Sequence, residues 1–151
     1  MALGDIKSAN AKIIYLPKAS GYTTPAAGDI VYFDATNGEM TLGTATSLGK
    51  HGIYTGITHV VGATTYYGVC VRGKCVCKAG GAIQPGNYVE SDTNADAVEA
   101  STSVTATYVQ GEIQRLWRIL GVFEHVEDDS TYAPADAAST NSIVVDVGAT
   151  P

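Results

Sequence analysis

Charged residues are scarce in this chain, and so are leucine and methionine. Asp, Glu, Lys and Arg make up 16% of the 151 residues, and Leu and Met together number 8. Long helices usually draw on Leu, Glu and Lys, so the scarcity argues against a helical bundle. By contrast, Val, Ile, Thr and Tyr together number 51, and Gly numbers 17. Because branched and aromatic side chains suit a half-buried pleated surface, the composition predicts one Gly-rich all-β domain.

Long apolar runs are also missing. No stretch approaches the roughly 18–20 uninterrupted apolar residues that span a bilayer, so we expect no membrane partner. Residues 1–20 contain Asp5, Lys7 and Lys12 and lack the apolar centre of a secretory signal, which predicts synthesis in a cytoplasm without export by that route. A surface so poor in charge suits a chain that is covered by assembly with others.

The few charges are unevenly distributed along the sequence. Residues 1–78 carry seven Lys and Arg against four acids, whereas residues 79–151 carry two Arg against eleven acids. Binding to nucleic acid needs clustered cations, so the acidic second half disfavours it, and we expect no nucleic-acid partner. The asymmetry is compatible with copies that meet head to tail.

The three cysteines do not form a recognisable framework. An odd count without a signal argues against disulfides, and the spacing of Cys70, Cys75 and Cys77 does not match a zinc site, which prefers two ligand pairs. We therefore interpret them as small buried hydrophobic residues and expect no metal. A metal-dependent enzyme that uses Cys75, Cys77 and His125 is the competing hypothesis.

Motifs for catalysis are absent from the sequence. It contains no Gly-x-Ser-x-Gly elbow, no His-Glu-x-x-His and no phosphate-binding loop with Lys followed by Ser or Thr. The acidic residues around His125 are typical of a solvated turn. We therefore expect no catalytic residues, no cofactor and no enzymatic activity.

Short extended segments alternate with turns along most of the chain. Residues 1–12 lack a helical stripe and are predicted to form a flexible N-terminal arm, followed by one β domain over residues 13–151. Three points stay open. Residues 72–74 form either a tight turn or a bulge in one long strand, residues 101–110 form either a ragged strand or a surface loop, and residues 113–120 fit a helical stripe as well as a strand. The expected strands are 13–16, 30–34, 40–42, 50–61, 66–72, 74–78, 88–90, 97–100, 115–126 and 143–147, with turns at 36–39, 63–65 and 92–95 and a long loop at 128–142.

The two halves of the chain resemble each other weakly. Three blocks recur in the same order, with Gly56 matched to Gly121, and this match favours a strand over 115–126. Each half has too little apolar face to fold alone, so we expect both to pack on one core as a small sandwich or barrel-like domain of two similar strand units. The matched blocks are 28–31 with 86–89, 53–59 with 118–124, and 69–73 with 144–148.

The order of these motifs resembles the phage capsid decoration proteins, also called cement or head-stabilising proteins. Gly-Asp-Ile-Val, Gly-Ile, a Val-x-Val-x-Gly run that continues through Ala-Gly-Gly-Ala-Ile and Pro-Gly-Asn-Tyr-Val, then Ile-Leu-Gly-Val and a closing Val-x-Val follow one another. In this sequence they occupy residues 28–31, 56–57, 69–89, 119–122 and 145–147. The resemblance covers roughly residues 25–148.

The resemblance implies a non-catalytic virion protein on the outer surface of an icosahedral phage head. Its partners would be the major capsid protein, whose adjacent subunits it clamps, and further copies of itself in a homotrimer. The family commonly has an N-terminal arm that becomes ordered on binding, so we expect capsid contacts in that segment at Leu3 and Ile6 and in the neighbouring strand at Ile13 and Tyr15. The alternative hypothesis is a non-catalytic β adhesion or ligand-binding module on a virion or cell surface.

Overall fold

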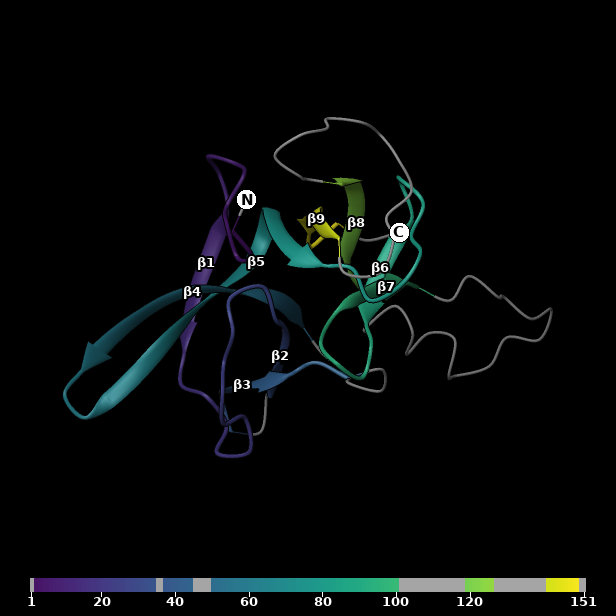
Figure 1. The fold of residues 1–151 in the computed structure, drawn as a ribbon. Helices are drawn as coiled ribbons and strands as arrows, with labels where there is room; N and C mark the ends of the chain where they lie inside the picture. The colour runs from purple at the N-terminus through teal and green to yellow at the C-terminus, as the bar shows by residue number, and fades with distance from the viewer. Residues whose placement is uncertain (1, 35–36, 45–49, 101–118, 127–140, 150–151) are drawn as a thin grey trace, which may run out of the picture.

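The computed structural model describes residues 2–34, 37–44, 50–100, 119–126 and 141–149, and within them every regular element is a strand. The strands form one curled antiparallel sheet in the order β3-β2-β4-β5-β9-β8-β6-β7, and β1 pairs separately with β5 (Figure 1). Within those ranges no helix is long and apolar enough to cross a membrane. The strands are β1 (Lys12–Leu16), β2 (Ile30–Asp34), β3 (Glu39–Leu42), β4 (His51–Val61), β5 (Thr64–Lys78), β6 (Tyr88–Ser91), β7 (Ala97–Glu99), β8 (Ile119–Val126) and β9 (Ser142–Val147).

The sheet consists of two four-stranded units with the same connectivity. In the first unit β2 pairs with β3 on one side and with β4 on the other, and β4 pairs with β5. In the second unit β6 pairs with β7 and with β8, and β8 pairs with β9. The units join where the second half of β5 pairs with β9. The prediction of an all-β, barrel-like domain built from two similar strand units is therefore confirmed.

Each unit contains a glycine at the same place in its sheet. Val31 lies opposite Gly52, and Val89 lies opposite Gly121. A Cβ atom on Gly52 would lie 2.6 Å from the carbonyl oxygen of Cys70, and one on Gly121 would lie 2.1 Å from that of Asp146. Such close approach of backbones admits only glycine. The structural counterpart of Gly121 is thus Gly52, and the match to Gly56 made from the sequence is wrong by four positions.

Strand β5 is one long strand that changes direction, which resolves the choice left open at residues 72–74. Its first half pairs with β1 and β4, its second half pairs with β9, and Gly73 lies between them with a φ of 96°. A positive φ strains any residue with a side chain, so glycine permits the bend. A side chain at Gly73 would also meet Ala11, whose Cα lies 2.8 Å from the Cβ position.

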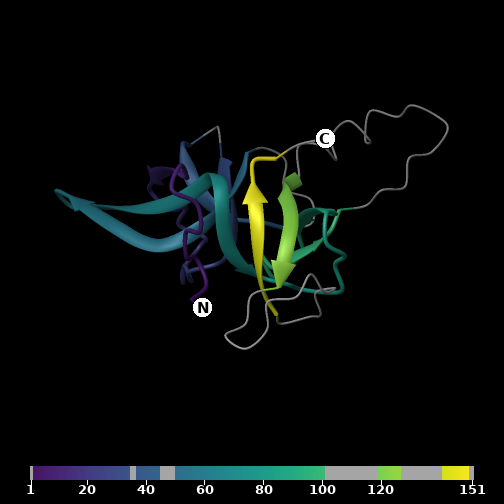
Figure 2. The same ribbon diagram turned by 90° about the horizontal axis from the view of Figure 1, so that it is seen from above.

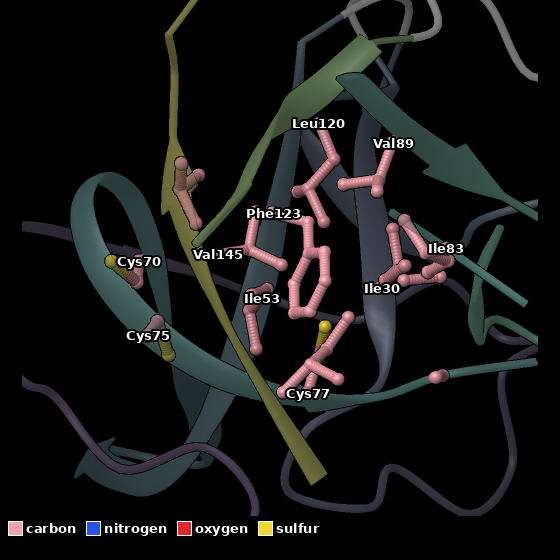
Figure 3. Close-up of a cluster of buried hydrophobic side chains, with 14 of the residues drawn as sticks. Ile30, Ile53, Cys70, Cys75, Cys77, Ile83, Val89, Leu120, Phe123 and Val145 are labelled. Carbon is pink, nitrogen blue, oxygen red and sulfur yellow. The ribbon is translucent and has the colours of Figure 1, made fainter. Parts of the chain in front are cut away.

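One hydrophobic core joins the two units. Ile30 and Ile53 of the first unit and Phe123 and Val145 of the second belong to the same buried cluster, and each has an exposed fraction of 0%. Figure 3 shows the Phe123 ring pointing into the space between these side chains. The Ile30 N–H also donates to the carbonyl of Ala95 in the second unit, at 3.0 Å. The halves therefore form a single packed body, as the shortage of apolar surface in each half predicts.

The remaining strand predictions agree with the structure where it describes them. Residues 119–126 are strand, whereas 101–110, 113–118 with most of the competing helical stripe, and nearly all of the predicted 128–142 loop lie outside the described residues. The turn predicted at 63–65 lies slightly earlier, because β4 ends at Val61 and β5 already begins at Thr64.

Candidate interaction surface

The large exposed apolar side chains of the described residues gather in one place. Val60, Val61 and Ile57 have exposed fractions of 69%, 67% and 44%, and all three lie in the distal half of β4. Together with the start of β5 this segment projects from the body as a hairpin (Figures 1 and 2). We call residues 57–65 the arm; this hairpin is distinct from the N-terminal segment of residues 1–12. Monomeric proteins seldom collect exposed apolar side chains on one projection, so the arm is a candidate contact surface.

The turn of the arm follows from its sequence. Val61 lies opposite Thr64, which leaves Gly62 and Ala63 as a two-residue loop. Gly62 has a φ of 62°, as required at the first position of a type II′ turn, and this turn matches the twist of the two strands. Because consecutive strand residues point to opposite faces, Val60 and Val61 make both faces of the arm apolar.

A bulge separates the arm from the body of the sheet. The pairing of β4 with β5 shifts register between Tyr54 and Thr58, and Gly56 has a φ of 84°. The Thr55 hydroxyl donates to the carbonyl of Gly68 at 2.8 Å and thereby ties the two strands together at the bulge. Below it the Tyr54 and Tyr67 rings pack edge to face, with centroids 5.7 Å apart. The base of the arm is therefore braced.

Tyr15 extends the apolar surface from β1 towards the arm. Its exposed fraction is 40%, and its ring lies edge-on against His59 with centroids 4.7 Å apart. Tyr15 also lies opposite Gly68, where the missing side chain leaves room for the ring. Of the four contacts predicted from the sequence, Tyr15 is thus the one that the structure places beside the arm.

The other predicted contacts lie against the domain. Leu3 lies on Gly28, since a Cβ there would be 2.6 Å from the Leu3 Cβ, and Ile6 forms a bridge with Cys75 and packs on the main core. Ile13 is half-buried opposite Cys70. Binding a shell through Leu3 or Ile6 would require these inward contacts to be released.

The segment predicted to be a flexible arm, residues 1–12, runs along β5 from residue 2 onward. The Gly4 N–H donates to the carbonyl of Val76 at 2.8 Å, and the Val76 N–H donates to the carbonyl of Asp5 at 3.0 Å. The Lys7 N–H donates to the carbonyl of Lys74, also at 2.8 Å. In this arrangement the segment covers the edge of the second half of β5.

The three thiols lie inside the domain. Cys70, Cys75 and Cys77 are free cysteines with exposed fractions of 0%, and Figure 3 shows Cys70 and Cys75 near the bend of β5. The interaction between these two neighbouring thiols raises the pKa of Cys75 and lowers that of Cys70, and burial raises the pKa of Cys77. Within the described ranges no three His, Cys, Asp or Glu residues come together to hold a metal ion.

Burial should protect these thiols from modification. We expect iodoacetamide to leave all three unmodified in the folded protein and to alkylate all three in urea, because the thiolate must be both formed and reachable. Mass spectrometry of the intact chain measures this directly. Alkylation of any of the three thiols in the folded protein would contradict the described burial.

A second surface feature is an open hollow of about 320 Å³, and none of its lining residues belongs to the arm. The Tyr22 hydroxyl donates to the Asp29 carboxylate, and the Ala26 N–H donates to the same group at 3.0 Å. Burial and the negative charge of Asp29 raise the pKa of Tyr22. The lining of the hollow thus combines hydroxyl and amide groups with one carboxylate. Its other residues include Thr23, Thr24, Thr41, Leu42 and Asn94.

Comparisons with protein-family models, with curated proteins and with solved structures find no match.

The arm is the feature that sequence reasoning missed. Residues 51–71 contain no Asp, Glu, Lys or Arg, and no other stretch of the sequence without charge is as long. Such a run is ordinary in a strand that is buried on both faces, but here its central part, residues 56–64, is exposed. The sequence feature that could have revealed the arm is a long pair of uncharged strands around a tight turn.

Proposed function

We propose that this chain is a structural virion protein that binds the outer surface of an icosahedral phage head. It acts by contact and without catalysis, and it stabilises the shell by clamping adjacent subunits of the major capsid protein. Its copies associate as they do in the decoration proteins that the sequence resembles, in which a homotrimer is usual. It is made in the host cytoplasm and resides on the assembled particle.

The concentration of exposed apolar side chains on the arm carries this proposal. Val60, Val61 and Ile57 stand on a braced projection, and Tyr15 continues the surface onto the body. A clamp needs a rigid body that presents apolar groups to more than one neighbour, because several modest contacts made at once give tight attachment. The shared core of the two strand units supplies the rigid body.

Removing apolar groups from this surface should weaken attachment to heads. Burying one such side chain is worth about 1.5–3 kcal/mol, so we expect Tyr15→Ser combined with Val61→Ser to lower the affinity for undecorated heads at least tenfold. Electron microscopy and co-sedimentation of particles mixed with purified protein measure the occupancy. The matched control is Gln84→Ser, an exposed change in the loop before β6. Full occupancy by the double variant, or no binding by the unaltered protein, contradicts the proposal.

The open hollow supports a second candidate function, a non-catalytic adhesion or ligand-binding module. Its hydroxyl and amide groups with one carboxylate suit a neutral polyhydroxyl ligand such as a glycan. Binding of the isolated protein to a glycan array, lost in Asp29→Asn but kept in the Tyr15 and Val61 double variant, would favour this function over capsid binding.

A further inference from the structure

The outer edge of β4 loses its neighbour where the arm begins. Strand β2 pairs with β4 at residues 51–53, and Tyr54 completes the pairing through bonds with the backbone of Gly28 and Asp29 at 2.8 and 2.9 Å. Beyond Tyr54, none of the strands that the structure describes pairs with this side of β4. Among the described strands, β5 is therefore the one that pairs with the distal part of β4.

The turn fixes which backbone groups face outward. In a two-residue hairpin the closing pair, here Val61 and Thr64, exchanges hydrogen bonds, and pairs then alternate between bonded and non-bonded. The pair of Val60 with Thr65 and the pair of Thr58 with Tyr67 are consequently non-bonded. The N–H and carbonyl groups of Thr58 and Val60 thus point away from β5, towards the open side of the arm.

Beyond the bulge, the edge of residues 58–61 lacks the charged side chains and prolines that commonly prevent strands from pairing between molecules. Proteins protect open edges with charged side chains, prolines or covering segments. In the described sheet, β1 is flanked by Lys12 and Pro17, β3 begins at Glu39 and β7 ends at Glu99. The run of residues 51–71 contains no proline and no Asp, Glu, Lys or Arg. Among these edges, the arm is the one suited to accept another strand.

We propose that the arm pairs with the arm of a second copy of this chain, β4 against β4, in antiparallel orientation about a two-fold axis. In such a symmetric interface each edge faces an identical edge, so a charged side chain on it would lie close to its own copy. This edge contains no Asp, Glu, Lys or Arg. With Thr58 opposite Val60 of the second copy, Ile57 lies opposite Val61 of that copy. The pairing joins the outward backbone groups and sets these apolar side chains beside one another across the two strands.

This inference goes beyond capsid binding and does not depend on it. It concerns a contact between copies that forms through the backbone edge of β4, and it requires no head. The faces of the arm remain available to other neighbours. Association of the purified protein and attachment to particles are therefore separate measurements, and either proposal can fail alone.

Proline substitution tests the edge without altering the ladder of the arm itself. Proline at residue 60 removes an N–H that faces outward, so Val60→Pro should spare the bonds between β4 and β5. We expect the unaltered protein to reach a molar mass of at least twice 15.6 kDa by light scattering after size-exclusion chromatography. Val60→Pro should weaken this association at least tenfold, because two symmetry-related bonds are lost.

Thr65→Pro is the matched control, since Thr65 lies opposite Val60 and its N–H faces outward from the other edge of the arm. It should leave the association unchanged, and circular dichroism should show both variants folded. A monomeric unaltered protein, an association that Val60→Pro does not weaken, or an equal loss in both variants would each overturn the proposal.

Discussion

Gly121→Ala is expected to destabilise the domain by about 3 kcal/mol or more, a large share of the stability of a domain this size. The new methyl carbon would lie 2.1 Å from the carbonyl oxygen of Asp146 on the neighbouring strand, and a backbone atom inside a sheet cannot move aside cheaply. Urea unfolding followed by far-ultraviolet circular dichroism measures the loss. We expect Gly52→Ala to behave in the same way, because its added carbon would meet the carbonyl of Cys70 at 2.6 Å.

Gly21→Ala provides the control for this pair. Gly21 is exposed, and no atom lies within 4 Å of the position that its Cβ would take, so we expect the free energy of unfolding to change by less than about 1 kcal/mol. If Gly121→Ala proved as stable as Gly21→Ala, the two equivalent glycines would have no common structural role. The assignment of Gly52 and Gly121 to equivalent positions in the two units would then be wrong.

The fold was largely predictable because its local signals agree with its sheet. Turn residues such as Asn37 and Gly38 separate strands that the structure confirms on either side. The repeat was also visible in the sequence, but its alignment was not, because Gly52 and Gly56 are both glycines in β4. Only their surroundings in the sheet distinguish them: Gly52 lies against the carbonyl of Cys70 on the neighbouring strand, whereas Gly56 lies in the bulge. Sequence similarity carries no information on that partner.

The candidate surface was less predictable than the fold. Composition does not distinguish Val60, which is exposed, from Val69, which is buried, because both lie in the uncharged run of residues 51–71. The exposure of a strand residue depends on how far its hairpin extends beyond the neighbouring strands. Here β2 pairs with β4 only as far as Ile53 of β4, whereas β4 continues to Val61. Composition likewise does not show that Leu3 and Ile6, two isolated apolar residues, lie against the domain.

Phe123→Ala is expected to cost about 3–5 kcal/mol and to do so in a single unfolding transition. Phe123 belongs to the second strand unit, yet its fully buried ring shares a cluster with Ile30 and Ile53 of the first. The cavity left by alanine would remove contacts from both units at once, so neither can unfold before the other. Circular dichroism and intrinsic fluorescence, followed in the same urea titration, should therefore give coincident curves with a lowered midpoint.

Phe33→Ala is the matched control, because Phe33 is the other phenylalanine of the chain and is only half-buried, outside both core clusters. We expect it to cost less than half as much. Two separate transitions in Phe123→Ala would mean that the units are independent and merely adjacent. That result would also remove the rigid body on which the arm depends, because an arm rooted in the first unit can hold neighbours in a fixed geometry only while both units move as one.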